Sequence, residues 1–495
     1  MARILLIFPP SLYRNFTPPL NLAYLAGVLE KSGHEVKVVD LSALHNPYSV
    51  EDVKILAKEF NPLWIGVTLN IVFIQPAYEF AQELKPLGIP LVAGGPHPSL
   101  MAEETLTNGY DIVVRGEGES TVVSLTSKLI NDENLDDLPG ISFVRKTGQI
   151  VHNPAGTLIA DLDKLPFPAK HLFPKAWYTQ NTPTYQIYGA IFSGRGCPAN
   201  CYYCYKGVFG HGCRLRSAEN VFSEMLHLHE THNVTAFEFL DDAFSADLSR
   251  VERLCDMILE KKDFSPAWQC TTRMDLITQD LLKKMKKAGC FRIFYGVESG
   301  DMDTLFRVNK HLDLNQAKKV LKWTREVGIR SIVGFMWGFP WDSPSSIRAS
   351  IKYLKTLSPV TDEFNPLGIL IPVPGTHLFD IYADRYDLKQ WWMSEKYGSL
   401  YRKNTYFPYF QRRFYNDFNL LDDGFFPFST HVKRLIKKGT SFIGRHNLFH
   451  SLPLYRSVIV YIAVLISKGL FKVHPMLEET VFSMMRRIKS VTAMK

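Results

Sequence analysis

The sequence lacks any long hydrophobic run. A transmembrane helix needs about 20 apolar residues, and the longest late candidate, Val458 to Ile466, is roughly half that length. The first apolar stretch, Ile4 to Phe8, leads into Pro9 and Pro10 without a small-residue cleavage site, so it favours a first strand over a signal peptide. These features predict a cytoplasmic protein that does not span a membrane.

Cysteine is scarce, with 7 residues in a chain of 495. An odd, scattered set argues against a disulfide framework and favours reduced thiols, some of them with metal ligands to supply. Hydrophobic residues make up 46% and charged residues 21% of the chain, which excludes disordered, collagen-like and coiled-coil classes. At roughly 150 residues per domain, the length predicts about three folded domains.

Acidic residues are scarce at the C-terminal end. From Tyr386 to Lys495 there are 18 Lys and Arg against 7 Asp and Glu, so this segment carries a net +11 and the first 385 residues carry −3. A basic segment rich in aromatic side chains fits peripheral contact with an anionic membrane surface. A solvated basic face is the simpler alternative. No RNA-binding motif accompanies it, so a nucleic-acid partner is not expected.

Residues 1–140 alternate short apolar runs with helical patterns. Five units of this kind predict a doubly wound parallel sheet of the Rossmann or flavodoxin type, covered by helices on both faces. The expected strands are Arg3–Phe8, Glu35–Leu41, Trp64–Leu69, Pro90–Gly94 and Asp111–Arg115. Ligands of this architecture bind beyond the carboxyl ends of the strands. The candidate binding residues there are Thr68, Gly94, Gly95, His97, Gly116 and Glu117, although glycine and proline in such loops also serve simply to make turns.

The rest of the chain divides into three predicted segments. Residues 141–185 are predicted to be a linker, with a hairpin around Lys146, Thr147 and Gly148. Residues 186–385 repeat a strand-helix pattern six times, which indicates a partial (β/α)6 barrel with its active site at the carboxyl ends of the strands. The expected strands are Tyr188–Ser193, Ala236–Leu240, Trp268–Thr272, Ile293–Val297, Ile332–Trp337 and Gly368–Pro372. Residues 386–495 form a mainly helical C-terminal segment for which no fold is assigned.

Three cysteines follow the first expected barrel strand. Cys197, Cys201 and Cys204 lie in one glycine-flanked loop at spacings of four and three residues. Thiolates are ligands for both zinc and iron-sulfur clusters. A structural zinc needs a fourth ligand, which Cys213 or His211 could supply, whereas a 4Fe-4S cluster held by three cysteines leaves one iron open to a substrate or cofactor. The spacing alone leaves both possibilities open.

The C-x-x-x-C-x-x-C motif, with Tyr203 before its last cysteine, resembles the radical S-adenosylmethionine superfamily. The resemblance implies that Cys197, Cys201 and Cys204 hold a 4Fe-4S cluster whose free iron binds S-adenosylmethionine, which is cleaved to a 5′-deoxyadenosyl radical. It also implies cofactor contacts at the carboxyl ends of later strands. Those residues are Asp241, Asp242, Arg273, Glu298 and Ser299. Carboxylates suit the methionine amino group because a charge-assisted hydrogen bond joins them.

The N-terminal part resembles the cobalamin-binding members of that superfamily. The resemblance rests on the segments Pro18–Ala26, Gly94–Pro98 and Arg115–Glu119, and it implies cobalamin as a further cofactor. The chain lacks the D-x-H-x-x-G motif that supplies the lower axial ligand of methionine-synthase-type domains. His97 is a candidate substitute, and a loop histidine bonded to its neighbours is the alternative.

The combined resemblance covers about residues 1 to 385 and predicts a cobalamin-dependent methyltransferase. Its substrate is expected to be an apolar or natural-product-type small molecule, methylated at an unactivated carbon with electrons from an external donor. One alternative is an oxidative cyclase of the anaerobic magnesium-protoporphyrin ester cyclase type. The other is a non-catalytic zinc or electron-transfer protein in which Cys213 closes the metal site.

Overall fold

The computed structural model describes residues 1–11, 14–178, 186–365, 368–394 and 425–450, together with Val458 and Ile462. These residues belong to two compact units. The first consists of Met1–Thr272, Lys283–Phe291 and the described part of Val373–Tyr401. The second consists of Arg273–Leu282, Arg292–Pro372 and the described part of Arg402–Lys495.

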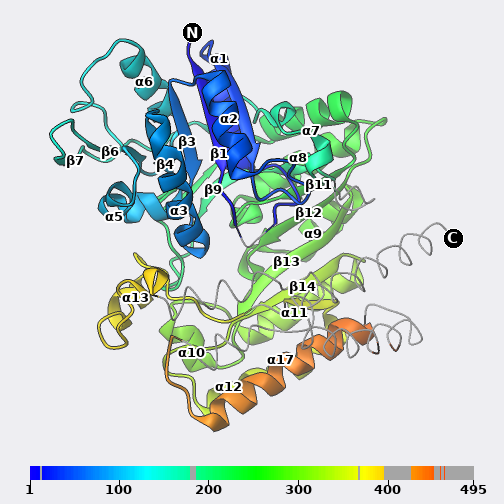
Figure 1. Cartoon of the computed structure of the whole chain (residues 1–495). Helices are drawn as coiled ribbons and strands as arrows, with labels where there is room; N and C mark the ends of the chain where they lie inside the picture. Colours follow the sequence, from blue (N-terminus) through cyan, green and yellow to red (C-terminus); the bar gives the residue numbers. More distant parts are fainter. Residues whose placement is uncertain are drawn as a thin grey trace. The chain divides into compact units, whose positions relative to one another are not determined.

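A seven-stranded sheet forms the N-terminal part of the first unit (Figure 1). Five parallel strands stand in the order β2-β1-β3-β4-β5. They are β1 (Arg3–Phe8), β2 (Glu35–Asp40), β3 (Trp64–Thr68), β4 (Leu91–Gly94) and β5 (Ile112–Val114). The connecting helices are α1 (Leu20–Lys31), α2 (Val50–Phe60), α3 (Ile74–Leu84), α4 (Pro96–Leu100), α5 (Ala102–Thr107) and α6 (Glu119–Ile130). The strand order reverses between β1 and β3, and open α/β sheets bind their ligands at this switch point.

The local sequence explains these elements. All five residues of β3 are buried, as expected for a strand covered on both faces. Helix α2 begins at a capping box in which the Ser49 hydroxyl accepts from the Asp52 N–H while the Asp52 carboxylate accepts from the Ser49 N–H. It ends at Asn61 in the left-handed region. The predicted doubly wound parallel sheet is therefore confirmed, with its five strands near the expected positions.

The hairpin expected in the linker extends this sheet. Strand β6 (Ile141–Val144) pairs antiparallel with β5, and β7 (Ile150–His152) pairs antiparallel with β6. Buried Ser142 and Phe143 show that β6 is part of the core. The hairpin thus continues the N-terminal sheet beyond residue 140, where the sequence predicted the linker to begin.

The first unit also holds three parallel strands from the start of the predicted barrel. Strands β8 (Ala190–Ile191), β11 (Ala236–Phe239) and β12 (Ala267–Thr272) pair in the order β12-β11-β8. Helices α7 (Ala218–His232) and α8 (Leu248–Glu260) pack against each other. Between β8 and α7 the chain makes a two-stranded antiparallel ribbon of β9 (Gly194–Cys197) and β10 (Gly212–Leu215). Helix α13 (His377–Tyr382) follows later in the chain.

The second unit continues the strand-helix series with parallel strands β13, β14 and β15. Its elements are β13 (Cys290–Glu298), α10 (Met302–Arg307), α11 (Leu314–Glu326), β14 (Arg330–Phe335), α12 (Pro344–Leu357), β15 (Glu363–Asn365) and α17 (Thr430–His450). Helix α9 (Gln279–Lys287) and β13 contribute residues to both units. Helix α17 packs against α12 and β15.

The prediction of a sixth barrel strand at Gly368–Pro372 is wrong. The strand is β15, which ends at Asn365, and only an isolated bridge joins Ile369 to Trp337. Among the described residues 368–372 only Ile369 makes a bridge, and Pro372 has no N–H to donate to a ladder. The residues expected at that strand end therefore belong to a loop.

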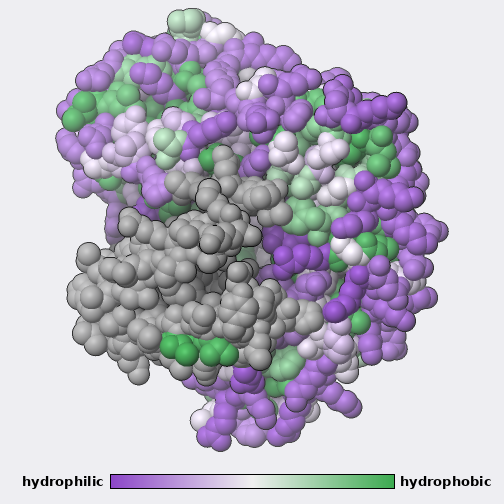
Figure 2. All heavy atoms as spheres, turned by 90° about the vertical axis from the view of Figure 1, so that its right-hand side faces the viewer, coloured by the Kyte–Doolittle hydropathy of each residue, from purple (hydrophilic) through white to green (hydrophobic). Residues whose placement is uncertain are grey.

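No helix of the described residues is both long and apolar enough to cross a membrane. On the face shown in Figure 2, the described surface is largely hydrophilic, with hydrophobic residues scattered among the polar ones. Most of the C-terminal segment, for which the sequence predicted helices, lies outside the described residues.

Candidate functional site

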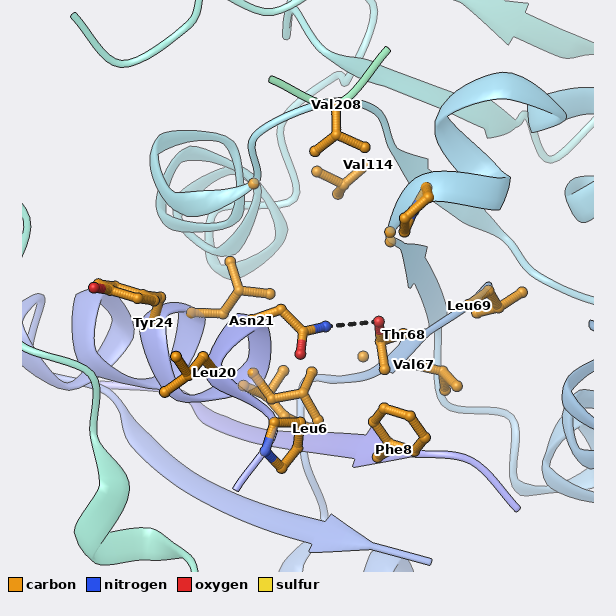
Figure 3. A pocket seen from close by; sticks show the side chains of 18 of the residues that line it. Leu6, Phe8, Leu20, Asn21, Tyr24, Val67, Thr68, Leu69, Val114 and Val208 are labelled. Atoms are coloured by element: carbon orange, nitrogen blue, oxygen red, sulfur yellow. Dashed lines mark hydrogen bonds between the residues drawn. The ribbon is translucent and has the colours of Figure 1, made fainter. Parts of the chain in front are cut away.

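A cavity of about 510 Å³ opens in the first unit at the carboxyl ends of the N-terminal strands (Figure 3). Apolar side chains such as Leu6, Phe8 and Val67 form much of its lining. Its amide and hydroxyl groups come from Asn15, Thr17, Asn21, Thr68 and Asn70. The Asn21 amide donates to the Thr68 hydroxyl at 2.7 Å, which fixes both side chains in the cavity wall.

Glycines shape the cavity beside β4 and β5. Gly95 has a φ of +111°, and a Cβ there would lie 2.6 Å from the Leu69 carbonyl oxygen. At Gly94 and Gly116 a Cβ would meet only one backbone oxygen each, at 3.9 and 3.8 Å, so the backbone faces open space there. An apolar floor with amide donors and exposed backbone suits a large amphipathic ring such as a corrin. Thr68, Gly94, Gly95, Gly116 and Glu117, all predicted from the sequence, line this one cavity.

His97 is not among the residues that line the cavity, so the prediction that it contacts cobalamin is not supported by its position. Pro96 starts helix α4, and the His97 side chain is buried among side chains of the first unit. Its Nε2 lies 3.0 Å from Glu104 Oε1 and 3.2 Å from the Tyr78 hydroxyl. Trp392 donates its indole N–H to the same Glu104 carboxylate. His97 therefore belongs to a buried network that holds the segment around Trp392.

The three motif cysteines lie at the end of β9 and in the loop that follows it. Cys197 ends β9, Cys201 is buried and Cys204 is exposed. The Cys204 N–H donates to the Cys201 carbonyl at 3.1 Å, and the Lys206 ammonium donates to the carbonyls of Cys197 and Ala199. No three His, Cys, Asp or Glu side chains of the described residues meet closely enough to hold a single metal ion. Three thiols in one hydrogen-bonded loop suit a cluster, whose separate irons take widely spaced ligands.

Cys213 lies across the ribbon from these cysteines. It pairs with Gly196 in the ladder, and its thiol lies 3.4 Å from the Gly196 carbonyl, to which it donates. Burial and the nearby Asp241 raise the pKa of the Cys213 thiol to about 11, which disfavours the thiolate that a metal requires. Cys213 is better placed as a structural thiol than as a fourth ligand.

The two carboxylates that follow β11 lie in different environments. Asp241 is buried, accepts from the Ser193 N–H at 2.6 Å and lies 3.9 Å from the Arg250 guanidinium. Burial raises the pKa of Asp241 above its ordinary value, while Arg250 and the Ser193 hydrogen bonds oppose that rise. Asp242 is exposed. Asp242 is therefore the carboxylate that an incoming amine can reach, and Asp241 holds the strand end together.

The remaining predicted cofactor residues belong to the second unit. Arg273 pairs with Asp275 at 2.7 Å. Glu298, at the end of β13, has a φ of +73°, a conformation rare outside glycine, and its carboxylate lies 3.1 Å from the buried Lys310 ammonium. Ser299 is buried and bonds to the Ser350 hydroxyl. A strained acid at a strand end indicates a functional constraint, because such a conformation persists only where the surroundings enforce it.

A group of charged residues beside the cavity was not predicted from the sequence. Glu117 was predicted, but its partners Glu119, Arg195 and Arg214 were not. Arg195 lies 2.7 Å from Glu117 and also pairs with Glu119, and Arg214 lies 2.7 Å from Glu117. The acidic side chains were visible in the G-E-G-E stretch, but nothing in the spacing shows which basic residues reach them from about 80 to 100 positions away.

Family models match both halves of this arrangement. The B12 binding domain model matches residues 13–126, and the radical SAM superfamily model matches residues 191–354. The chain belongs to the radical S-adenosylmethionine enzymes that carry a B12-binding domain. The predicted family, fold class and enzymatic nature are thereby confirmed, and the alternative of a non-catalytic metal protein is set aside.

Related proteins of this enzyme family align over most of the chain. An uncharacterized methyltransferase of Pyrococcus horikoshii is 29% identical over 77% of this chain and 83% of its own length. The anaerobic magnesium-protoporphyrin IX monomethyl ester cyclase of Rubrivivax gelatinosus is 26% identical over 75% of this chain and 67% of its own length. Among solved structures, the radical S-adenosylmethionine methyltransferase TsrM from Kitasatospora setae superimposes with a TM-score of 0.63 at 20% identity, over 78% of this chain and 75% of that one. This last likeness concerns the fold.

Proposed function

We propose that this enzyme is a cobalamin-dependent methyltransferase that acts on an unactivated carbon of an apolar small molecule. The observation that carries the proposal is the composition of the cavity. The ends of β1, β3, β4 and β5 line it together with Phe192, Arg195, Val208, Phe209 and Leu240 from the segments around the cysteine loop. A cofactor bound in the B12-binding domain would therefore lie beside that loop. The methyltransferases among the relatives support the same function.

The roles of individual residues follow from their chemistry. Cys197, Cys201 and Cys204 hold the cluster as thiolates, and Thr68, Gly94, Gly95 and Gly116 receive the corrin. When bound, the cluster and S-adenosylmethionine supply a 5′-deoxyadenosyl radical and cobalamin supplies a methyl group. Within the first unit, Asp242 would offer a carboxylate to the methionine amino group of S-adenosylmethionine.

The cavity wall near the cysteine loop favours an apolar substrate. Phe192, Val208, Phe209 and Leu240 contribute hydrocarbon surface, and Leu240 is 39% exposed. An apolar wall excludes water, which protects a radical from side reactions. We propose that the substrate presents its reacting carbon against this wall, and that an external electron donor reduces the cluster.

The test needs no knowledge of the substrate. The full chain is purified without oxygen in the presence of cobalamin, its iron and cobalt are measured, and the reduced protein is incubated with S-adenosylmethionine. A methyltransferase forms S-adenosylhomocysteine, the product left after loss of the methyl group, as well as 5′-deoxyadenosine. Formation of 5′-deoxyadenosine alone would favour the cyclase, and a preparation that binds neither metal would contradict the proposal.

Helix α17 supports a proposed contact with an anionic membrane surface. Its 21 residues include five Lys and Arg and no Asp or Glu. Val432, Ile436 and Ile443 are buried on one side, whereas Arg434, Lys438 and Arg445 are exposed. Basic residues near an anionic surface contribute about 1 kcal/mol each. The protein should therefore sediment with phosphatidylglycerol vesicles and lose most of this binding when the three exposed residues become Gln. Equal binding to neutral phosphatidylcholine vesicles would contradict a charge-based contact.

A further inference from the structure

Four charged side chains of the first unit connect the cobalamin cavity to the ribbon that carries the first cluster cysteine. Glu117 and Glu119 lie at the start of helix α6 in the B12-binding domain, and Arg195 and Arg214 lie on β9 and β10. The Glu117 carboxylate contacts both guanidiniums, since Oε1 is 2.7 Å from Arg195 Nη1 and Oε2 is 2.7 Å from Arg214 Nη1. We call these four residues the ion bridge.

The ladder register explains why the ion bridge needs Glu117. Arg195 and Arg214 are directly opposite each other in the antiparallel pair of β9 and β10. Two like charges at opposed positions repel and destabilise the pair. Glu117 is held between them by both of its oxygens, and it also accepts from the Ile159 N–H at 2.7 Å. The B12-binding domain thus supplies the counter-charge without which this ribbon is strained.

The ion bridge is shielded from water. The exposed fraction of the side chain is 1% for Glu117, 7% for each of Glu119 and Arg195, and 19% for Arg214. The Arg195 guanidinium also lies over the rings of Tyr24 and Phe209, at 5.5 and 5.6 Å. Buried pairs are screened little by solvent, and loss of one partner leaves an uncompensated charge. The geometry of the ribbon therefore depends on these contacts.

The same side chains form part of the cavity wall. Tyr24, Glu117, Glu119, Arg195 and Phe209 all line it. Arg195 is two residues from Cys197 in the same strand. The cavity wall also includes the glycines Gly94, Gly95 and Gly116, which we call the glycine cradle. Hydrogen bonds link two of them, because the Ser99 hydroxyl donates to the Gly95 carbonyl and accepts from the Gly116 N–H. A ligand that contacts this wall therefore also contacts the ion pairs that hold the ribbon of β9 and β10, and with it Cys197.

We propose that the ion bridge couples occupation of the cobalamin cavity to the position of the cluster loop, with Arg195 as a positioning residue. The inference rests on the proposed function, because it requires both cofactors to bind. Cobalamin that fills the cavity fixes Glu117 and Arg195 in one arrangement, and this arrangement fixes Cys197 through β9. Cobalamin and S-adenosylmethionine then affect each other's affinity by the same factor, as any coupling of two binding sites requires.

The experiment measures that factor in the full chain with its cluster reconstituted. The dissociation constant of S-adenosylmethionine is obtained from the electron paramagnetic resonance spectrum of the reduced cluster, with and without cobalamin. We expect cobalamin to tighten binding by at least about fivefold, the lower end of typical coupling. In Glu117→Gln and Arg195→Lys we expect the factor to fall to about one while the iron content is kept. Arg195→Lys preserves the charge but removes the two-pronged contact.

Arg145→Lys is the matched control, because Arg145 forms a 2.7 Å ion pair with Asp136 at the surface of the same unit. The control should retain the full factor. A factor of one in the unaltered protein, or an unchanged factor in both variants, would overturn the coupling. If Glu117→Gln fails to fold, Arg195→Lys and the unaltered protein still decide the question. Loss of cobalt or iron from the unaltered protein would instead contradict the proposed function, so the two failures are distinguishable.

Discussion

The two parallel strand sets of the first unit use the same architectural position for different chemistry. In the N-terminal sheet, the carboxyl ends of the strands carry glycines, amides and hydrocarbon side chains around a cavity. In the set formed by β8, β11 and β12, the corresponding ends carry Ser193, Asp241 and Thr272, and the cysteine loop lies between the first two strands. The first region offers a shaped, largely apolar surface, and the second offers charged groups and thiols. Changes in the cavity should therefore act first on cobalamin, and changes in the cysteine loop should act first on the cluster.

The largest expected effect is the loss of iron when a cysteine of the cluster loop is replaced. Cys201→Ala removes one of three thiolate ligands, so the iron content should fall from about four per chain to near zero. Cobalt content should stay within about twofold, because Cys201 does not line the cavity. Cys213→Ala is the control, and it should retain the iron. Metal analysis after anaerobic reconstitution checks both variants, and equal iron loss in Cys213→Ala would restore Cys213 as a ligand.

A substitution in the glycine cradle should have the opposite pattern, with weaker cobalamin binding and unchanged iron content. Gly95→Ala places a Cβ at a φ of +111° and 2.6 Å from the Leu69 carbonyl oxygen, so the loop between β4 and α4 must move. We expect cobalamin binding to weaken by more than tenfold while the iron content is kept. Spectroscopic titration with cobalamin measures the change.

Gly88→Ala controls for the backbone conformation alone. Gly88 also has a positive φ, +68°, but a Cβ there meets nothing within 4 Å. It should lower the free energy of unfolding by about 1 to 2 kcal/mol through the left-handed conformation, and it should leave cobalamin affinity unchanged. Similar losses of cobalamin affinity in both glycine variants would show that the close approach of Gly95 to Leu69 is not what cobalamin binding requires.

The comparison also explains what the sequence could predict. The N-terminal strands and their end loops followed from periodicity and glycine placement, because local backbone chemistry determines both. The ion bridge did not follow, since Glu117 and Arg214 are 97 residues apart and only tertiary packing brings them together. The predicted contact between His97 and cobalamin is not supported by its position, because the sequence does not distinguish a loop histidine beside a cavity from a buried helical histidine. The sixth strand was predicted at Gly368–Pro372 and lies at Glu363–Asn365, because a short apolar run does not by itself show which residues pair with β14.

A smaller effect should distinguish the two carboxylates after β11. Asp242→Asn should weaken S-adenosylmethionine binding by about tenfold, since a hydrogen bond to a charged group contributes about 1.5 to 3 kcal/mol. Asp241→Asn should mainly lower the thermal unfolding temperature, because it leaves Arg250 without its buried counter-charge. Titration followed by the cluster spectrum and thermal denaturation measure the two quantities. The opposite assignment of effects would make Asp241 the cofactor ligand.

An acid near a strand end of the second unit should make the stability of the protein depend on pH. Asp342, beyond β14, accepts from the N–H groups of Gly338 and Phe339 at 2.8 and 3.0 Å with one oxygen. Desolvation, with a further contribution from Asp301, raises its pKa to about 7 from an ordinary value of 3.8.

Because the folded state then keeps a proton that the unfolded state releases, the free energy of unfolding falls as pH rises from about 4 to 7 and levels off above. Between pH 5.5 and 7 the fall should be about 1.5 kcal/mol. Asp342→Asn retains the accepting oxygen and removes the titration, so its stability should change less over that interval. Denaturant unfolding at several pH values measures both proteins. Parallel pH profiles of the two proteins would show that the Asp342 carboxyl ionises as it does in water.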